Sequence, residues 1–278
     1  SICGVGEDAP CSGDLFLRNG GVDGGPPHAP NGGSHSADLR LFVVRKGATL
    51  KLHQMNLSRG VSYEVEGRGC SLQGTVCGGG LVHATGAGTR VEASECVFEA
   101  GIAAHSQIGG SFGGGAIYAT FGATVVLNNS IVRGNLAAQS GGGIMMFDES
   151  TLFLKKSTIE RNWAASIGGG LVGSSAAPYN APRSIKIVDS TLKFNFVGSL
   201  DLTSLESGSG GGAAFRFCRA VNFTNSSVYG NLAYSNGGGV TLADRSVVHL
   251  RGTSIRENVA GPESIKATNT SSLYTKNI

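Results

Sequence analysis

The sequence has little charge, little proline and no long apolar run. Charged residues are 15% of the chain, against about 25% in an ordinary globular protein, and only 7 of the 278 residues are proline. So little proline excludes a collagen-like chain and the proline-rich signature of disorder. A formal net charge of +3 is too small to predict nucleic-acid binding. Apolar runs are four or five residues long, as at 41–44, whereas a membrane-spanning helix needs about 20. We therefore expect no nucleic-acid partner and no membrane span.

Residues that could hold a metal or carry out catalysis are also scarce. The six histidines match no zinc motif, and phosphate-binding glycine loops and the GGxGxD calcium repeat are absent. Polysaccharide hydrolysis needs two carboxylates about 5–9.5 Å apart. Glu64 and Glu66, with Arg68 nearby, are the one candidate pair, whereas Asp148 and Asp244 share a repeat position but lie three repeats apart. We interpret the pair as a solvated strand face and expect no enzyme, no metal and no cofactor.

The cysteines are six in number, so complete pairing is possible. The close pairs are Cys3 with Cys11 and Cys70 with Cys77. These pairs predict two short-loop disulfides and hence an oxidising compartment; the alternative is six free buried thiols. Cys96 and Cys218 are far apart in the sequence and are expected to stay free.

Glycosylation motifs point to the same compartment. Five N-x-S/T sequons occur, against about three expected by chance. They begin at Asn56, Asn128, Asn222, Asn225 and Asn269. The chain starts at Ser1 without a leader, as expected for a mature secreted chain or an excised fragment. We predict a glycoprotein located outside the cell or at its surface.

Glycine, in contrast, is abundant, with 45 residues, more than twice the usual ~7%. Glycine triplets begin at residues 78, 113, 141, 168, 210 and 237. The step is 27 residues from 141 to 168 and again from 210 to 237, which predicts a solenoid with insertions. We interpret the triplets as coil corners that need positive φ and close approach of neighbouring coils.

A second motif, [S/T]-x-[I/L/V]-x-x-N, ends at residues 135, 162, 195, 231 and 258. When seven segments are aligned on it, the positions three, eight and ten before the asparagine are always apolar, and the position nine before is mixed. This period of two indicates β-strands, and the absence of helical spacing excludes helical repeats. The remaining solution is a parallel β-helix in which each coil rises about 4.8 Å.

The asparagine that ends this motif is interpreted as structural. A coil corner leaves backbone groups without strand partners, and a buried amide can bond both these groups and the amides of neighbouring coils. The predicted ladder comprises Asn135, Asn162, Asn195, Asn231 and Asn258. The apolar row that follows it comprises Leu136, Trp163, Phe196, Leu232 and Val259. We interpret Trp163 as a packing residue rather than as a platform for a sugar ring.

These motifs resemble those of a known group of proteins. The unit [S/T]-x-[I/L/V]-x-x-N-x-A, followed by GGG and an apolar residue, resembles the repeats of chlamydial polymorphic outer-membrane proteins and of pectin-lyase-like right-handed β-helix proteins. The resemblance covers about residues 38–278 and implies a right-handed coil, surface exposure, adhesion and often oligomeric assembly. We therefore expect an all-β, right-handed parallel β-helix of about seven coils at 38–278, after an N-terminal cap segment at 1–37.

The strands after the glycine triplets form the predicted partner surface. The row four residues after each first glycine is largely apolar, and its interface candidates are Val82, Ile117, Met145 and Val172. Such a face indicates a partner, or else a loop of the same chain covers it. We predict a structural or adhesive β-helix that self-associates or joins other surface subunits, with glycans as further candidate ligands. The alternative is a β-helix that binds or cleaves carbohydrate.

Overall fold

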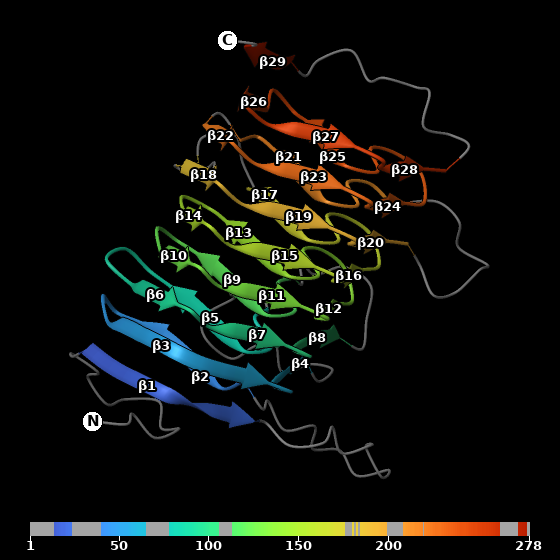
Figure 1. The fold of residues 1–278 in the computed structure, drawn as a ribbon. Helices are drawn as coiled ribbons and strands as arrows, with labels where there is room; N and C mark the ends of the chain where they lie inside the picture. The colour runs from blue at the N-terminus through green and yellow to red at the C-terminus, as the bar shows by residue number, and fades with distance from the viewer. Residues whose placement is uncertain are drawn as a thin grey trace, which may run out of the picture.

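A computed structural model describes residues 14–23, 40–64, 78–105, 113–175, 180, 182, 184–198, 208–218, 220–261 and 272–276. These residues form 29 β-strands in three sheets and no helix. Strands of successive coils pair in parallel, and the coils stack into a column (Figure 1). The described part of the chain is therefore a parallel β-helix.

Two of the sheets take one strand from each coil. Sheet C follows the glycine corners and consists of β2 (Phe42–Arg45), β5 (Val82–Thr85), β9 (Ile117–Thr120), β13 (Ile144–Phe147), β17 (Leu171–Ser174), β21 (Ala213–Arg216) and β25 (Val240–Ala243). Sheet B precedes the next glycine corner and consists of β4 (Val61–Glu64), β8 (Ile102–His105), β12 (Leu136–Ala137), β16 (Trp163–Ala164), β20 (Phe196–Val197), β24 (Leu232–Ala233) and β28 (Val259–Ala260).

Sheet A consists of two stacks that share β3. The first stack is β1 (Asp14–Asp23), β3 (Thr49–Ser58), β6 (Arg90–Ser94), β10 (Thr124–Asn128), β14 (Thr151–Lys155), β18 (Ser184–Val188), β22 (Val221–Thr224), β26 (Val247–Arg251) and β29 (Ser272–Lys276). The second stack is β7 (Val97–Glu99), β11 (Ile131–Arg133), β15 (Thr158–Glu160), β19 (Thr191–Lys193), β23 (Ser227–Tyr229) and β27 (Ser254–Arg256). Between the stacks, each coil turns at a residue with positive φ, such as Asn129 or Lys156.

Alternation along each strand decides which side chains fill the column. In β10, Val125 and Leu127 are buried, whereas Val126 between them is only half-buried. The register places Val125 between Val91 and Leu152 of the neighbouring coils. Because in-register parallel pairing stacks equivalent residues, each apolar row continues from coil to coil and joins one core cluster. Burying each such side chain contributes roughly 1.5–3 kcal/mol.

The glycine corners follow a register that the triplets alone do not reveal. Gly78 pairs with Gly113, and Gly113 pairs with Ser140, so the first two triplets begin one position earlier than the later four. The shared positive-φ row is therefore Gly79, Gly114, Gly141, Gly168, Gly210 and Gly237. The next row is also glycine throughout, because a Cβ there, as at Gly115 or Gly142, would collide with the backbone of the following coil.

Two strands extend the first stack of sheet A at its ends. Strand β1 lies inside the segment that the sequence predicts as a cap, and it pairs with β3 so that Leu15 and Leu17 lie beside Leu50 and Leu52. Strand β29 pairs with β26 at the other end. An unpaired strand edge is prone to unwanted pairing with other chains. Strand β1 therefore continues the apolar rows and covers one edge of β3.

Candidate functional site

The five predicted asparagines form one hydrogen-bonded ladder at the corner between sheets A and B. From Asn135 to Asn258, each Nδ2 donates to the Oδ1 of the next asparagine at 2.8–3.0 Å. In Asn195, Nδ2 also donates to the Ile159 carbonyl at 3.0 Å, and Oδ1 accepts from the backbone N–H of Asn162 at 3.1 Å. The four members from Asn135 to Asn231 are each 1% exposed. The ladder therefore serves the backbone and presents no group to a ligand.

The structure corrects the predicted partner surface. Val82 and Ile117 belong to the main core, whereas Met145 and Val172 belong to a second cluster on the outer side of sheet C. All four side chains are 0–3% exposed, so none of them forms an exposed face. The row was aligned wrongly because the first two triplets begin one position earlier, and a shift of one residue moves a side chain to the other face of a strand.

The outer side of sheet C instead holds buried polar groups. The rings of His83 and Tyr118 meet edge to face with centroids 5.2 Å apart. Arg40 lies 2.7 Å from His83 Nδ1. Burial, followed by the charge of Arg40, lowers the pKa of His83 to about 3, and burial raises the pKa of Tyr118. His83 Nε2 and the Tyr118 hydroxyl have no hydrogen-bond partner among the described residues, but both atoms are inaccessible.

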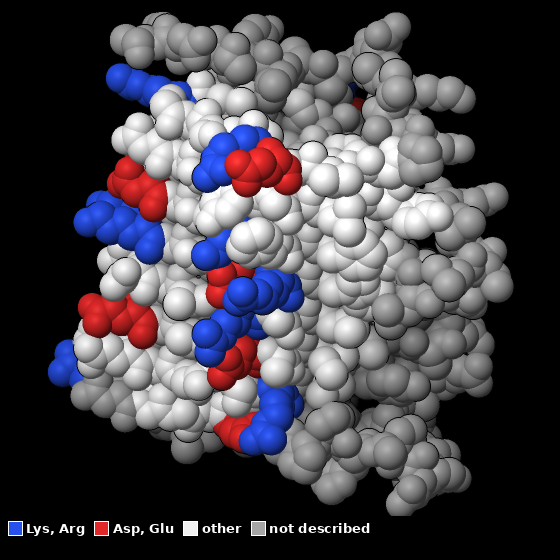
Figure 2. Space-filling view, turned by 45° about the vertical axis from the view of Figure 1, so that its right-hand side comes forward, with Lys and Arg blue, Asp and Glu red and all other residues white. Residues whose placement is uncertain are grey.

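Charged and aromatic groups, all but Glu160 half-buried or exposed, gather on a ridge along the corner between sheets A and B. This charged ridge comprises Arg59, Glu99, Arg133, Glu160, Arg161, Lys193, Phe194, Tyr229, Arg256 and Glu257. Two adjacent positions of each coil supply it: the last residue of the sheet A strand and the residue after it, which has positive φ. Figure 2 shows its charged members as a vertical column of both signs.

Pairs between successive coils orient the ridge. Glu99 accepts hydrogen bonds from Arg133 Nε at 2.8 Å and from Asn56 at 3.1 Å, and Glu160 pairs with Lys193 at 3.2 Å. The hydrogen bond from Arg133 lowers the pKa of Glu99, although its partial burial opposes this. The exposed Arg133–Glu99 pair contributes only about 0–1 kcal/mol, whereas Glu160 is buried at 9% exposure. The main effect of the two pairs is to fix the directions of Arg133 and Lys193.

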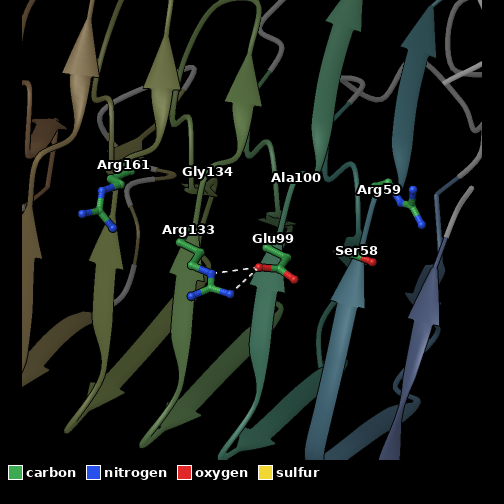
Figure 3. A pocket seen from close by; sticks show the side chains of 7 residues that line it. All are labelled: Ser58, Arg59, Glu99, Ala100, Arg133, Gly134 and Arg161. Atoms are coloured by element: carbon green, nitrogen blue, oxygen red, sulfur yellow. Dashed lines mark hydrogen bonds and ion pairs between the residues drawn. The ribbon is translucent and has the colours of Figure 1, made fainter. Parts of the chain in front are cut away.

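A shallow hollow of about 470 Å³ lies on the N-terminal half of the ridge. It is lined by Ser58, Arg59, Glu99, Ala100, Arg133, Gly134 and Arg161 (Figure 3). The hollow exists because Ala100 and Gly134 occupy positions where other coils have long side chains. Arg59 pairs with Asp23, whereas the carboxylate of Glu160 is 3.7 Å from Arg161, whose side chain is 69% exposed. Of the three arginines that line the hollow, Arg161 is thus the most exposed.

Beside the ridge, the outer face of sheet B carries an uncharged strip. This apolar strip comprises Ile102, Leu136, Trp163, Phe196, Leu232 and Val259. Leu232 and Val259 are 42% and 57% exposed, and the other members are half-buried. Trp163 therefore does not pack inside the column, where the adjacent Ala164 lies instead. In Figure 2, uncharged surface lies beside the column of charges, on the side of sheet B.

Several predicted site residues lie outside the described residues. These are Cys3, Cys11, Cys70, Cys77, Glu66, Arg68, Asn269 and the side chain of Glu64. The predicted disulfides and the carboxylate pair therefore stay predictions.

The remaining predicted site residues are in the described part. Asn56, Asn128 and Asn225 are exposed, and Asn222 is half-buried. Cys96 and Cys218 are free and buried. Burial raises the pKa of both thiols, that of Cys218 to about 12.

No group of three or more His, Cys, Asp or Glu side chains in the described ranges is placed to hold a metal ion. Nor does that part of the chain contain a helix long and apolar enough to cross a membrane.

Sequence analysis missed the aromatic centre of the ridge. Phe194 stands directly before the ladder asparagine, at a position where the motif allows any residue. A signal was present, because Phe194 is the only aromatic among the seven equivalent residues. The alternation of Glu99, Arg133, Glu160 and Lys193 in neighbouring coils was a second signal.

The family of the chain follows from the match of a family model to the repeat region. The family model for the right-handed β-helix region matches residues 57–277. The chain belongs to the right-handed β-helix family. The match includes the asparagine ladder and all of the charged ridge of this right-handed β-helix, and it provides the hand of the coil. No curated protein matches the chain, and no solved structure matches it.

Proposed function

We propose that this right-handed β-helix is a structural or adhesive protein that acts outside the cell or at its surface. The observation that carries the proposal is the charged ridge, which places cations and aromatic rings at one corner of the column. Its charged groups are visible in Figure 2. The exposed sequons at Asn56, Asn128 and Asn225 support the extracellular location. A contact surface fixed by in-register strands suits attachment to an extended target.

Binding, rather than catalysis, is proposed for the ridge. Glycoside hydrolysis uses one carboxylic acid and one carboxylate on either side of the bond that is cleaved. On the ridge, Glu99 is engaged by Arg133 and Asn56, and Glu160 by Lys193. Both carboxylates thus already orient cations, and these cations are the groups that face an external ligand.

Adhesion of protein-coated beads under shear tests the proposal. The surfaces are collagen, a phospholipid bilayer, and gels of neutral and acidic polysaccharide. The ridge variant is R133A/R256A, and the matched control is K155A/R251A, which removes two exposed cations from the first stack of sheet A. We expect wild-type and control beads to adhere to at least one surface and the ridge variant to detach. Wild-type beads that adhere to none of them would overturn the adhesive function, and equal adhesion by both variants would overturn the role of the ridge.

Self-association is proposed through the apolar strip, with a second copy of the chain as the partner. The strip carries no charge from Ile102 to Val259, and the small residues Ala138 and Ala165 lie beside it. Two such strips can pack face to face around a two-fold axis, since a self-complementary patch suffices for a dimer. Light scattering should give twice the chain mass for wild type and one chain mass for Leu232→Asp. A wild-type monomer at high concentration would refute this partner.

A further inference from the structure

The last glycine corner that the structure describes, just before β25, differs from the others in the residue that precedes its positive-φ glycine. That position holds Asn236, whereas the earlier coils have Gly78, Gly113, Ser140, Ile167 and Ser209 there. Gly237 follows with φ of 57°. In an asparagine-glycine pair the backbone nitrogen can approach the side-chain amide closely, because glycine has no Cβ to hinder it. Both residues are half-buried, so water reaches the pair.

The backbone N–H of Gly237 is not engaged as its equivalents are. The corresponding N–H groups each donate to a carbonyl of the following coil at 2.9–3.1 Å, and they belong to Gly79, Gly114, Gly141, Gly168 and Gly210. Those five glycines are buried, whereas Gly237 is half-buried and its N–H has no hydrogen-bond partner among the described residues. The nitrogen of Gly237 can therefore lose its proton without breaking a bond between coils.

Two donors act on the carbonyl of the same peptide bond. The carbonyl oxygen of Asn236 accepts from the N–H of Gly210 at 2.9 Å and from the hydroxyl of Thr241 at 3.3 Å. When the nitrogen of Gly237 loses its proton, this oxygen shares the negative charge, so both donors stabilise the anion that attacks. Thr241 has the only aliphatic hydroxyl in its row, whose other members are Val43, His83, Tyr118, Met145, Val172 and Ala214.

We propose that Asn236 and Gly237 form a self-modifying site at which the asparagine is converted to aspartate and isoaspartate. The nitrogen of Gly237 forms a bond to Cγ of Asn236, its proton passes to solvent, and the side-chain amide leaves as ammonia. Water then opens the succinimide ring. Attack of water at Cγ yields aspartate, and attack at the backbone carbonyl yields isoaspartate. Water is the only co-reactant, and the site is independent of the adhesive function.

Conversion changes the corner in two ways. An acidic side chain replaces a neutral amide, and in isoaspartate the backbone gains one methylene group. The hydrogen bonds from Gly210 N–H to Asn236 O at 2.9 Å and from Gly211 N–H to Gly237 O at 3.1 Å depend on the register of this corner. The longer backbone shifts that register, so we expect the last described coil to loosen as isoaspartate accumulates.

The chain offers two matched controls. Asparagine-glycine pairs begin at residues 19, 31 and 236, and the first lies inside strand β1, where pairing with β3 holds its backbone extended. The pair at residue 31 lies outside the described residues. Thr241→Val removes the hydroxyl but keeps the shape of the side chain, and Val172 already holds the same position in an earlier coil. Circular dichroism checks that this variant keeps its strands.

Incubation of the full chain at neutral pH tests the inference, with peptide mass spectrometry as the readout. Digestion with pepsin at acid pH avoids conversion during handling. In the native protein we expect Asn236 to convert faster than Asn19. Thr241→Val should slow Asn236 about threefold or more, which is the effect of one lost hydrogen bond. In urea the hydroxyl is no longer held at the carbonyl, so wild type and variant should convert at the same rate.

Three comparisons of rate would overturn the inference. These are conversion of Asn236 in urea but not in the native protein, conversion of Asn19 as fast as that of Asn236 in the native protein, or equal native rates for wild type and Thr241→Val. An isoaspartate-specific methyltransferase identifies the second product. Converted protein that this enzyme does not methylate would exclude the succinimide route.

Discussion

Removing one rung from the middle of the asparagine ladder should be costly, and Asn195→Ala is the test. The substitution deletes four buried hydrogen bonds: two that Oδ1 accepts from Asn162, and two that Nδ2 donates to Ile159 O and Asn231 Oδ1. At a net ~0.5–1.5 kcal/mol each, their loss should lower the free energy of unfolding by roughly 2–6 kcal/mol. The backbone N–H of Asn162 accounts for much of this, because it is left buried without a partner.

Urea unfolding followed by circular dichroism measures the effect. Asn128→Ala is the matched control, because this asparagine is exposed and should change stability by less than about 0.5 kcal/mol. Asn258→Ala probes the half-buried end of the ladder, where water can replace part of the lost amide, so its cost should be smaller than that of Asn195→Ala. If the cost at Asn195 is no larger than at Asn128 or at Asn258, the ladder does not support the column as argued here.

Three further predictions follow from the same structure, two on substitutions and one on the reactivity of a thiol. Because the pKa of His83 is about 3 in the fold and 6.5 when unfolded, its contribution to stability is complete above pH 6.5 and is lost as pH falls toward 3. Denaturation curves of His83→Gln should lack this loss, and equal acid sensitivity would contradict it. Phe194→Gly should raise the free energy of unfolding by about 0.5–1 kcal/mol, since glycine tolerates positive φ, and a destabilised variant in urea would refute the strain. Cys218 should resist a thiol reagent in the native protein and react after unfolding, as mapped by mass spectrometry; rapid native labelling would disprove its burial.

The repeat could be predicted because every coil uses the same physical solution at the same position. Apolar rows such as Val91, Val125 and Leu152 repeat in each coil, and a period of two identifies them as strands. The ladder could be predicted for a related reason, since a buried polar residue in the same place in five coils requires partners in the neighbouring coils.

The register of the glycine corners could not be predicted, because the sequence does not show which glycines of different triplets are equivalent. Glycine stands in two structural rows, one with positive φ and one where coils touch, and an additional glycine before or after these rows has no separate signature. Counting from the first glycine therefore moved Val82 and Ile117 into a row with Met145 and Val172. Strand β1 was missed because Leu15 and Leu17 form only one short alternation, without the motif that marks the coils.

The candidate site was the part of the structure that could least be predicted from the sequence. The sequence indicated where polar residues alternate along the ridge, but exposure at Phe194 depends on how its ring lies over Gly230, a contact between residues 36 positions apart. Variable positions of a repeat are where surface chemistry differs between coils. Motif analysis ignores these positions by design, and functional residues of a solenoid therefore escape it.

The in-register stacking of the coils also has a consequence for how such a protein can change in evolution. Duplication of one 27-residue unit adds one rung to the ladder and one member to every surface row, and it lengthens the column by about 4.8 Å. Its cross-section stays the same, because the new coil contacts only its two neighbours. The length of the column and the number of its surface contact points can thus increase together, by one strand spacing and one residue in each row for every added coil.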